Sequence, residues 1–152
     1  MRDVAFSCDD NGAKFLRVTV WSLLKHYTGT EPLRINVFEG FGGHSAENKA
    51  KLQAIVDSHQ RPRGEDAAGT VDIRYINVEK AIEPYADLIM NREKSRWNVF
   101  TWTPIFTPML LADATGNVAH FDIDMLFNDD VSIVNESERI GTNDSLRFVP
   151  IR

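Results

Sequence analysis

The 152-residue sequence predicts an α/β fold built on a mainly parallel β-sheet with helices on its faces. Short apolar runs alternate along the chain with segments whose apolar residues recur at helical spacing. This alternation is typical of β-α-β units, in which a helix connects two parallel strands. A chain of this length can form one hydrophobic core, so we expect a single domain over residues 1–152.

The first half of the chain contains three predicted strands and two predicted helices. The strands are Val4–Phe6, Leu33–Phe38 and Val71–Val78. The first helix is expected to begin at Asp10 or Asn11, which are favourable N-cap residues, and to end at Gly29. The second helix is expected to begin after Ser45, whereas the polar residues 60–70, which contain Pro and Gly, predict a loop.

The second half has a less regular pattern. Its predicted elements are a helix at 79–91 interrupted by Pro84, an apolar helix at 97–112, a strand at Val118–Phe121 and a weak strand at Leu146–Val149. Pro104 and Pro108 should bend the apolar helix, because proline has no backbone N–H to donate within it.

The composition excludes several classes of protein. Lys and Arg number 17 against 22 Asp and Glu, a net charge of −5 without a basic cluster, which argues against nucleic-acid binding. No apolar run approaches the ~18–20 residues of a membrane-spanning helix, and we expect no signal peptide at the N-terminus. Cys8 is the only cysteine, so no internal disulfide can form and we expect a cytoplasmic protein.

Acidic residues follow two of the predicted strands. Asp9, Asp10 and Asn11 come after the first strand, and Asp122 and Asp124 come after the fourth. Ligands of parallel α/β sheets bind at the carboxyl ends of the strands. If the two strands are neighbours, their acidic side chains therefore meet in one crevice.

Asp122 and Asp124 are the strongest candidates for a metal site. Side chains two positions apart in an extended chain point to the same side, so both carboxylates can reach one hard divalent cation. Such a cation keeps coordination positions open for the oxygens of a diphosphate. The surrounding segment is apolar, where two uncompensated carboxylates would repel each other. A helix cap or a solvated turn is the alternative.

The other polar residues have simpler interpretations. Asp9, Asp10 and Asn11 are ordinary N-cap and turn residues, which is compatible with ligand binding. Cys8 is interpreted as a small residue at a strand end rather than as a nucleophile. The four histidines form no ligand set, and His120 is expected to be packed or hydrogen-bonded. No P-loop is present, and no G-x-G-x-x-G motif follows the first strand.

Several segments together resemble glycosyltransferase family 8, whose members have a GT-A fold. The similar segments are Asp3–Asn11, Val18–Leu24, Ile35–Phe38, Asp72–Val78 and Phe121–Leu126, in the family's order. The resemblance spans nearly the whole chain but only the N-terminal part of the family's catalytic domain. It implies a GT-A-like (Rossmann-like), mainly parallel sheet flanked by helices and truncated relative to the full family domain.

The resemblance also implies a chemistry. The donor would be a nucleotide sugar, usually a UDP-hexose, with Mn²⁺ or Mg²⁺ bridging its diphosphate. Asp122 and Asp124 would be the D-x-D metal ligands, and Asp122 would also lie near the ribose. Asp9 and Asn11 would lie at the nucleoside, and we count Asp10 between them among the donor-binding residues. The hexose would pass, with retention of configuration, to an unidentified sugar, lipid or protein acceptor.

The sequence departs from the family's pattern in places. Gly12 stands where an aromatic residue usually contacts the base, Pro104 where an Arg contacts the donor, and Asn117 where a Lys precedes the D-x-D strand. We expect no counterpart of the family's C-terminal half, which supplies a third metal ligand and the acceptor site. Two alternatives to an active glycosyltransferase therefore stay open. One is a non-catalytic nucleotide- or metal-binding module, and the other is a scaffold that self-associates through a sheet edge. An active enzyme could instead be completed by a partner chain.

Overall fold

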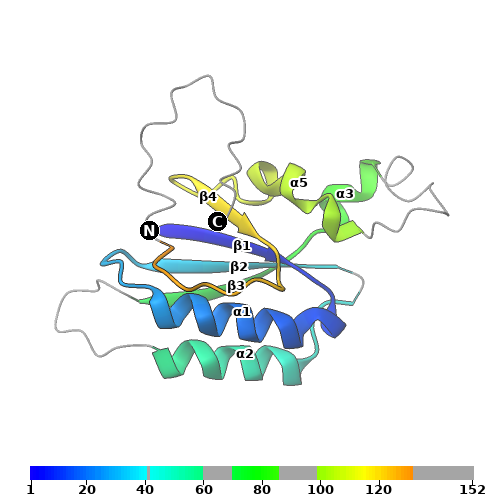
Figure 1. The fold of residues 1–152 in the computed structure, drawn as a ribbon. Coiled ribbons are helices and arrows are strands. Elements are labelled where there is room, and N and C mark those ends of the chain that lie inside the picture. Colours follow the sequence, from blue (N-terminus) through cyan, green and yellow to red (C-terminus); the bar gives the residue numbers. More distant parts are fainter. Residues whose placement is uncertain (41, 60–69, 86–98, 132–152) are drawn as a thin grey trace.

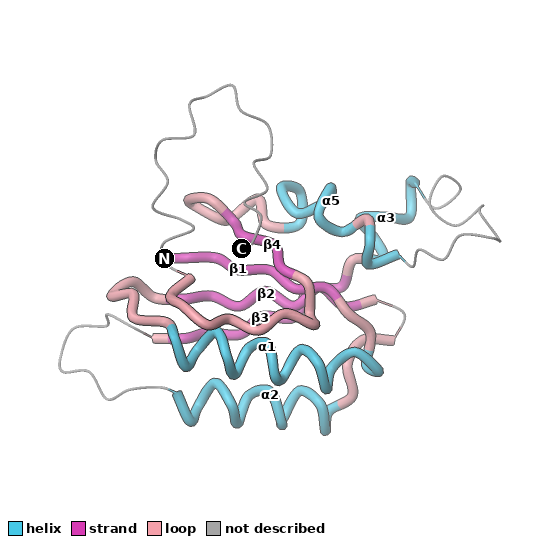
Figure 2. Tube along the Cα trace, viewed as in Figure 1, coloured by secondary structure: helices cyan, strands magenta, loops and turns pink. Residues whose placement is uncertain are grey.

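A computed structural model describes residues 1–40, 42–59, 70–85 and 99–131. These residues form a sheet of four parallel strands with helices on both faces, which is the predicted α/β, Rossmann-like arrangement (Figures 1 and 2). The strands are β1 (Arg2–Ser7), β2 (Leu33–Glu39), β3 (Val71–Asn77) and β4 (Val118–Phe121). Their order across the sheet is β3-β2-β1-β4, so β1 is paired on both edges.

Helices cover the two faces of the sheet in pairs. The helices are α1 (Ala13–His26), α2 (Ala46–His59), α3 (Glu79–Ile82) and α5 (Thr103–Leu110), with 3₁₀ turns η1 (Asp10–Gly12), η2 (Glu83–Tyr85) and η3 (Val99–Thr101). Figure 1 shows α1 and α2 on one face and α3 and α5 on the other. No helix in the described part of the chain is long and apolar enough to cross a membrane.

The main hydrophobic core lies between the sheet and α1 and α2. Alternate residues of β1 and β2 point into it and are buried against the inward faces of the two helices. Its strand residues are Val4, Phe6, Leu33, Ile35 and Val37, and its helix residues include Leu16, Val20, Leu23, Leu52 and Val56. A smaller core on the other face contains Ala5 and Phe38 with Ile82 and Leu111. Burial on both faces explains why the strands have nearly continuous apolar runs.

A paired polar network occupies the second face near the amino ends of the strands. The Arg34 guanidinium donates to both oxygens of Asp3, at 2.6 and 3.1 Å, and the Asn36 amide donates to Asp3 at 2.9 Å. Asp3 is only 2% exposed. Arg34 and Arg74 also pair with the exposed carboxylate of Asp113. These partners compensate a carboxylate that would otherwise be costly to bury.

The first helix ends earlier than the sequence predicts. Tyr27, and not Gly29, follows the last helical residue, His26, and has extended backbone angles. The Tyr27 hydroxyl donates to the Glu31 carbonyl at 2.8 Å, which folds its buried ring over Gly29. A Cβ at Gly29 would lie only 2.5 Å from that hydroxyl oxygen. Gly29 therefore provides space for the tyrosine instead of ending the helix.

The prolines follow the prediction at Pro84 but not at Pro104. Pro84 lies in η2, directly after the short α3, so the helical segment is interrupted there as predicted. Pro104 is the second residue of α5, where a helix needs no N–H donor, so it marks the start of a helix and not a bend within one. Pro108 lies inside α5. Residues 86–98 of the two predicted helices, and the weak strand predicted at 146–149, lie outside the described residues.

Replacing Asp3 with Ala should lower the free energy of unfolding by roughly 2–4 kcal/mol, because Arg34 would lose its most buried partner. Denaturant unfolding followed by circular dichroism measures this change. Asp57→Ala, which removes an exposed carboxylate from α2, is the control and should cost less than ~0.5 kcal/mol. A loss of similar size in the two variants would contradict the role given to the network.

Candidate functional site

The carboxyl ends of β1 and β4 form the floor of a cleft. The two strands pair in register, with Phe6 opposite Phe121. The chain runs outward from β1 to β2 and β3 and then returns to the other edge of β1, so the direction of the strand order reverses between β1 and β4. Crevices for ligands form at such reversals. A cleft of about 640 Å³ opens there.

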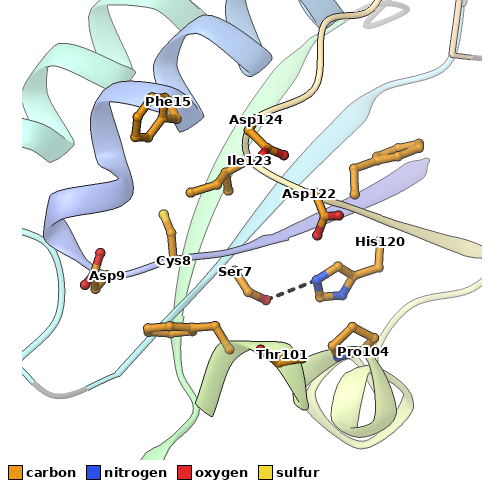
Figure 3. Close-up of a pocket in the computed structure, with 12 residues that line it drawn as sticks. Ser7, Cys8, Asp9, Phe15, Thr101, Pro104, His120, Asp122, Ile123 and Asp124 are labelled. Carbon is orange, nitrogen blue, oxygen red and sulfur yellow. Dashed lines mark hydrogen bonds between the residues drawn. The ribbon is translucent and has the colours of Figure 1, made fainter. Parts of the chain in front are cut away.

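The cleft brings together three of the five predicted site residues (Figure 3). Asp9 lines it from the end of β1, and Asp122 and Asp124 line it from the segment after β4. Asp10 and Asn11 are not among the lining residues. The predicted meeting of acidic side chains from the first and fourth strands is thus confirmed for Asp9, Asp122 and Asp124.

Asp122 and Asp124 have exposed carboxylates without a bonding partner among the described residues. The strand ends at Phe121, and Ile123 and Asp124 form a turn, so the extended geometry assumed for the pair is wrong beyond Asp122. Figure 3 shows Ile123 pointing towards Cys8 and the two carboxylates pointing away from it. The pair is therefore presented to the cleft by a turn whose middle residue is anchored in the protein.

Two side chains of α1 hold this turn in place. The Thr19 hydroxyl contacts the carbonyl oxygens of both Ile123 and Met125, the latter at 2.9 Å. The Ser22 hydroxyl accepts from the Phe127 N–H at 3.1 Å. Thr19 and Ser22 are both buried, which shields these hydrogen bonds from water. Backbone groups that lie outside the sheet are thus satisfied by α1, and the carboxylates stay free.

Gly12 allows the turn to approach the start of α1 closely. Its N–H donates to Asp9 Oδ1 at 2.8 Å, so Asp9 caps η1 as well as lining the cleft. A Cβ at Gly12 would lie 2.8 Å from the Cys8 Cβ and 2.9 Å from the Ile123 Cδ1. Only a residue without a side chain fits between these two groups.

Asp10 is bonded to α2 and not to the cleft. Its Oδ1 accepts from the Ser45 N–H at 2.8 Å and from the Asn48 amide at 2.7 Å. The hydrogen bond from Asn48, together with that from Ser45, lowers the pKa of Asp10. The prediction that Asp10 or Asn11 is the N-cap of the first helix is wrong, because the N-cap of α1 is Gly12 and Asp10 binds the start of α2 instead. A donor-binding role for Asp10 and for the exposed Asn11 stays a prediction.

His120 is packed and hydrogen-bonded, as predicted. Its Nε2 lies 3.1 Å from the Ser7 hydroxyl and its Nδ1 lies 3.0 Å from the Thr107 hydroxyl. The Ser7 hydroxyl also contacts that of Thr103, which connects β1 to α5. Burial lowers the pKa of His120 to about 4, so the ring is neutral at pH 7. This network fixes one wall of the cleft.

Sequence reasoning missed part of the cleft lining, including Ser7, Phe15 and Phe100, whereas the family resemblance had already placed the position of Pro104 at the donor. Ser7 could have been found, because it ends the first strand and the carboxyl-end rule applies to it. Phe15, which is 50% exposed, lies in the first turn of α1 and carries no sequence signal that separates it from a core aromatic residue. Phe100 and Pro104 reach the cleft only because α5 packs beside β4.

Cys8 lines the cleft and begins a row of buried polar side chains. Its Sγ lies 3.3 Å from His44 Nε2, and His44 Nδ1 lies 3.1 Å from Glu39 Oε2. Lys49 pairs with the other oxygen of Glu39 at 2.9 Å. Burial is the main cause that raises the pKa of Cys8 to about 12, and the negative charges of Asp9, Asp10 and Glu39 add to it. The arrangement has the order of a catalytic triad but holds the sulfur as a thiol.

Metal binding at the cleft would depend on Asp122 and Asp124. Within the described ranges, no three His, Cys, Asp or Glu side chains gather in a way that could hold a metal ion. Two exposed carboxylates without partners fit a hard divalent cation, which prefers oxygen ligands, provided that other oxygens complete its coordination.

The fold is similar to that of glycosyltransferases of known structure. The galactosyltransferase LgtC, solved in complex with donor and acceptor sugar analogs, aligns with a TM-score of 0.61 and 26% identity over 87% of this chain and 41% of its own. The chain has a GT-A glycosyltransferase fold. The apo bifunctional glycosyltransferase WbbM gives a TM-score of 0.66 at 21% identity, over 88% of this chain and 20% of its own. Apo mouse xyloside xylosyltransferase 1 gives 0.55 at 10% identity, over 90% and 48%.

These likenesses confirm the fold that the family-8 resemblance implied. The chain spans less than half the length of each of the three glycosyltransferases. No protein-family model and no curated protein matches it.

Gly12→Ala should displace the turn at Ile123 and destabilise the protein by roughly 1–3 kcal/mol, because the new Cβ overlaps the Cys8 side chain. Gly116→Ala is the matched control, since a Cβ there meets nothing within 4 Å, and it should be close to neutral. Thermal unfolding of both variants measures the difference. A neutral Gly12→Ala would show that the approach of the turn is not constrained by this residue.

Cys8 should react slowly with thiol reagents between pH 7 and 9. A thiol with a pKa raised to about 12 contains almost no thiolate there, and the thiolate is the reactive form. The rate of reaction with 5,5′-dithiobis(2-nitrobenzoate) should be at least ~100-fold lower in the folded protein than in denaturant. Comparable rates in the two states would mean that the buried row does not protect the sulfur.

Proposed function

We propose that the chain is a glycosyltransferase that binds a nucleotide-sugar donor and uses a divalent cation. The donor that we propose is a UDP-hexose. The observation that carries the proposal is the pair of unpartnered carboxylates, Asp122 and Asp124, at the reversal of strand order. The same fold in LgtC supports it, since that enzyme was solved with donor and acceptor sugar analogs.

The proposed metal ligands are Asp122 and Asp124, with Mn²⁺ or Mg²⁺ as the cation. When bound, the cation would neutralise charge on the donor's diphosphate as it becomes the leaving group. Thr19 and Ser22 position the carboxylates by fixing the backbone of the turn. Preorganised ligands reduce the entropy that binding would otherwise cost.

The nucleoside end of the donor is assigned to the Asp9 side of the cleft. Asp9 is exposed there, although one oxygen caps η1, and its second oxygen is available to a ribose hydroxyl. The exposed ring of Phe15 offers an apolar surface in the same cleft. The neutral imidazole of His120 and the hydroxyl of Ser7 support the opposite wall, on the side of Asp122 (Figure 3).

Donor binding without sugar transfer is the second candidate function. It is favoured by one observation, which is that the cleft lining contains the carboxylate pair but no described residue to which a role in sugar transfer is assigned. The cleft is lined by the ends of β1 and β4 together with residues of α1, η3 and α5, and no acceptor-binding element is assigned to it. A binding module would use the same carboxylates and the same cation.

Calorimetric titration with UDP should detect binding that requires Mn²⁺. Asp124→Asn and Asp122→Asn should each weaken it by at least ~10-fold, because each removes a charged ligand. Asp72→Asn, at an exposed carboxylate near the amino end of β3, is the control and should bind like the wild type.

A second measurement separates the two candidate functions. UDP released from UDP-glucose or UDP-galactose, measured with and without simple sugar acceptors, would indicate transfer or hydrolysis. Mn²⁺-dependent binding without release would leave the binding module. Absence of UDP binding, or equal binding in Asp124→Asn, would refute both.

A further inference from the structure

The exposed face of α1 is apolar and basic. Five of its residues are exposed, namely Lys14, Phe15, Val18, Trp21 and Lys25. The three large apolar side chains are 50%, 53% and 45% exposed, respectively. The opposite face of the same helix forms the main core, so the exposed face is not needed for packing against the sheet.

A fourth apolar side chain extends this face. Leu126 is 70% exposed and belongs to the segment that Thr19 and Ser22 bind to α1, with the neighbouring Phe127 N–H on Ser22. We call Phe15, Val18, Trp21 and Leu126, with Lys14 and Lys25, the α1 patch. Groups of exposed large apolar residues mark interaction surfaces.

The charges of the α1 patch are all positive. The helix sequence contains Lys14, Arg17 and Lys25 and no acidic residue, although the whole chain has a net charge of −5. The Lys14 ammonium lies 4.9 Å from the centre of the Phe15 ring, and the Lys25 ammonium lies 5.1 Å from that of Trp21. Each lysine is therefore held beside an aromatic ring, where its charge borders apolar surface.

We propose that the α1 patch binds reversibly to membrane surfaces that contain anionic phospholipids. Tryptophan and phenylalanine insert favourably at the boundary between headgroups and acyl chains, and lysines beside them contact lipid phosphates. This binding mode is peripheral and uses the folded domain. The inference goes beyond the proposed function and does not rest on it, because no metal or nucleotide is involved.

The charge of the patch favours a membrane over a second copy of the chain. Four partly exposed side chains present roughly 400 Å² of apolar surface, when a large aromatic residue is taken as ~150–250 Å². This area is close to the apolar share of the ~800 Å² that a stable dimer buries on each partner, so the sign of the charge decides between the two. A symmetric dimer through this face would also bring lysines together, whereas anionic headgroups complement them. The acidic side chains of Asp124 and Asp130 lie beyond the two ends of α1 and not within the patch, so the patch itself stays positive.

The patch adjoins the cleft, since Phe15 belongs to both. A membrane bound to α1 would therefore lie beside the opening between β1 and β4.

Co-sedimentation with vesicles tests the inference directly. The wild type should bind vesicles of phosphatidylcholine mixed with phosphatidylglycerol, and bind much less to phosphatidylcholine alone. Binding should weaken as NaCl is added.

Two double variants test the α1 patch. Val18→Ser/Trp21→Ser should lose most of the binding, and in Lys14→Glu/Lys25→Glu the affinity for the vesicles should fall at least roughly fivefold for each lysine. These side chains are exposed, so the variants should keep the wild-type circular dichroism spectrum.

Ile105→Ser/Met109→Ser is the matched control, because it removes exposed apolar residues, 68% and 54% exposed, from α5 instead. It should bind the anionic vesicles like the wild type. The inference is overturned if the wild type does not bind them, if both patch variants bind unchanged, or if the α5 control loses as much binding. A concentration-dependent dimer in analytical ultracentrifugation that Val18→Ser/Trp21→Ser abolishes would also overturn it, in favour of self-association.

Discussion

The position of β1 between β2 and β4 is the constraint on which the rest of this structure depends. Hydrogen bonds on both edges of β1 fix its carboxyl end beside that of β4. The connection from β1 then leaves towards α1 on one face, while the segment after β4 returns over the same helix. The cleft exists because these two connections diverge from neighbouring strand ends.

The carboxylates of the cleft depend on hydrogen bonds made by residues that carry no charge. Thr19 and Ser22 satisfy backbone groups of the segment after β4, and Gly12 lets that segment approach η1. Buried hydroxyl groups on a rigid helix are suited to this, because they position the backbone without adding charge near the acidic pair. The geometry of a cation site is thus determined mainly by a helix that would not itself contact the cation.

The buried polar side chains that resemble catalytic groups are explained by pairing. Asp3 is compensated by Arg34 and Asn36, and Cys8 lies in a row with His44 and Glu39. Burial keeps Cys8 protonated near neutral pH. The low dielectric of the interior makes an unpaired group costly, so these networks stabilise the fold and leave Asp122 and Asp124 as the acidic pair without partners in the described part of the chain.

The sequence by itself determined the fold class, the four strands and the acidic residues at their ends. Those features come from local patterns, namely apolar periodicity, caps and the residues that end a strand. Helix ends were less well determined, because the end of α1 depends on the contact of Tyr27 with Gly29 and Glu31, which no local preference encodes. Only the tertiary structure decided which strands are neighbours, which of the acidic residues enter the cleft, and that Phe15 and Phe100 line it. Asp10 illustrates the reason. Its identity suits a cap and a ligand equally well, and its role is decided by the distance to Ser45 and Asn48 on another element.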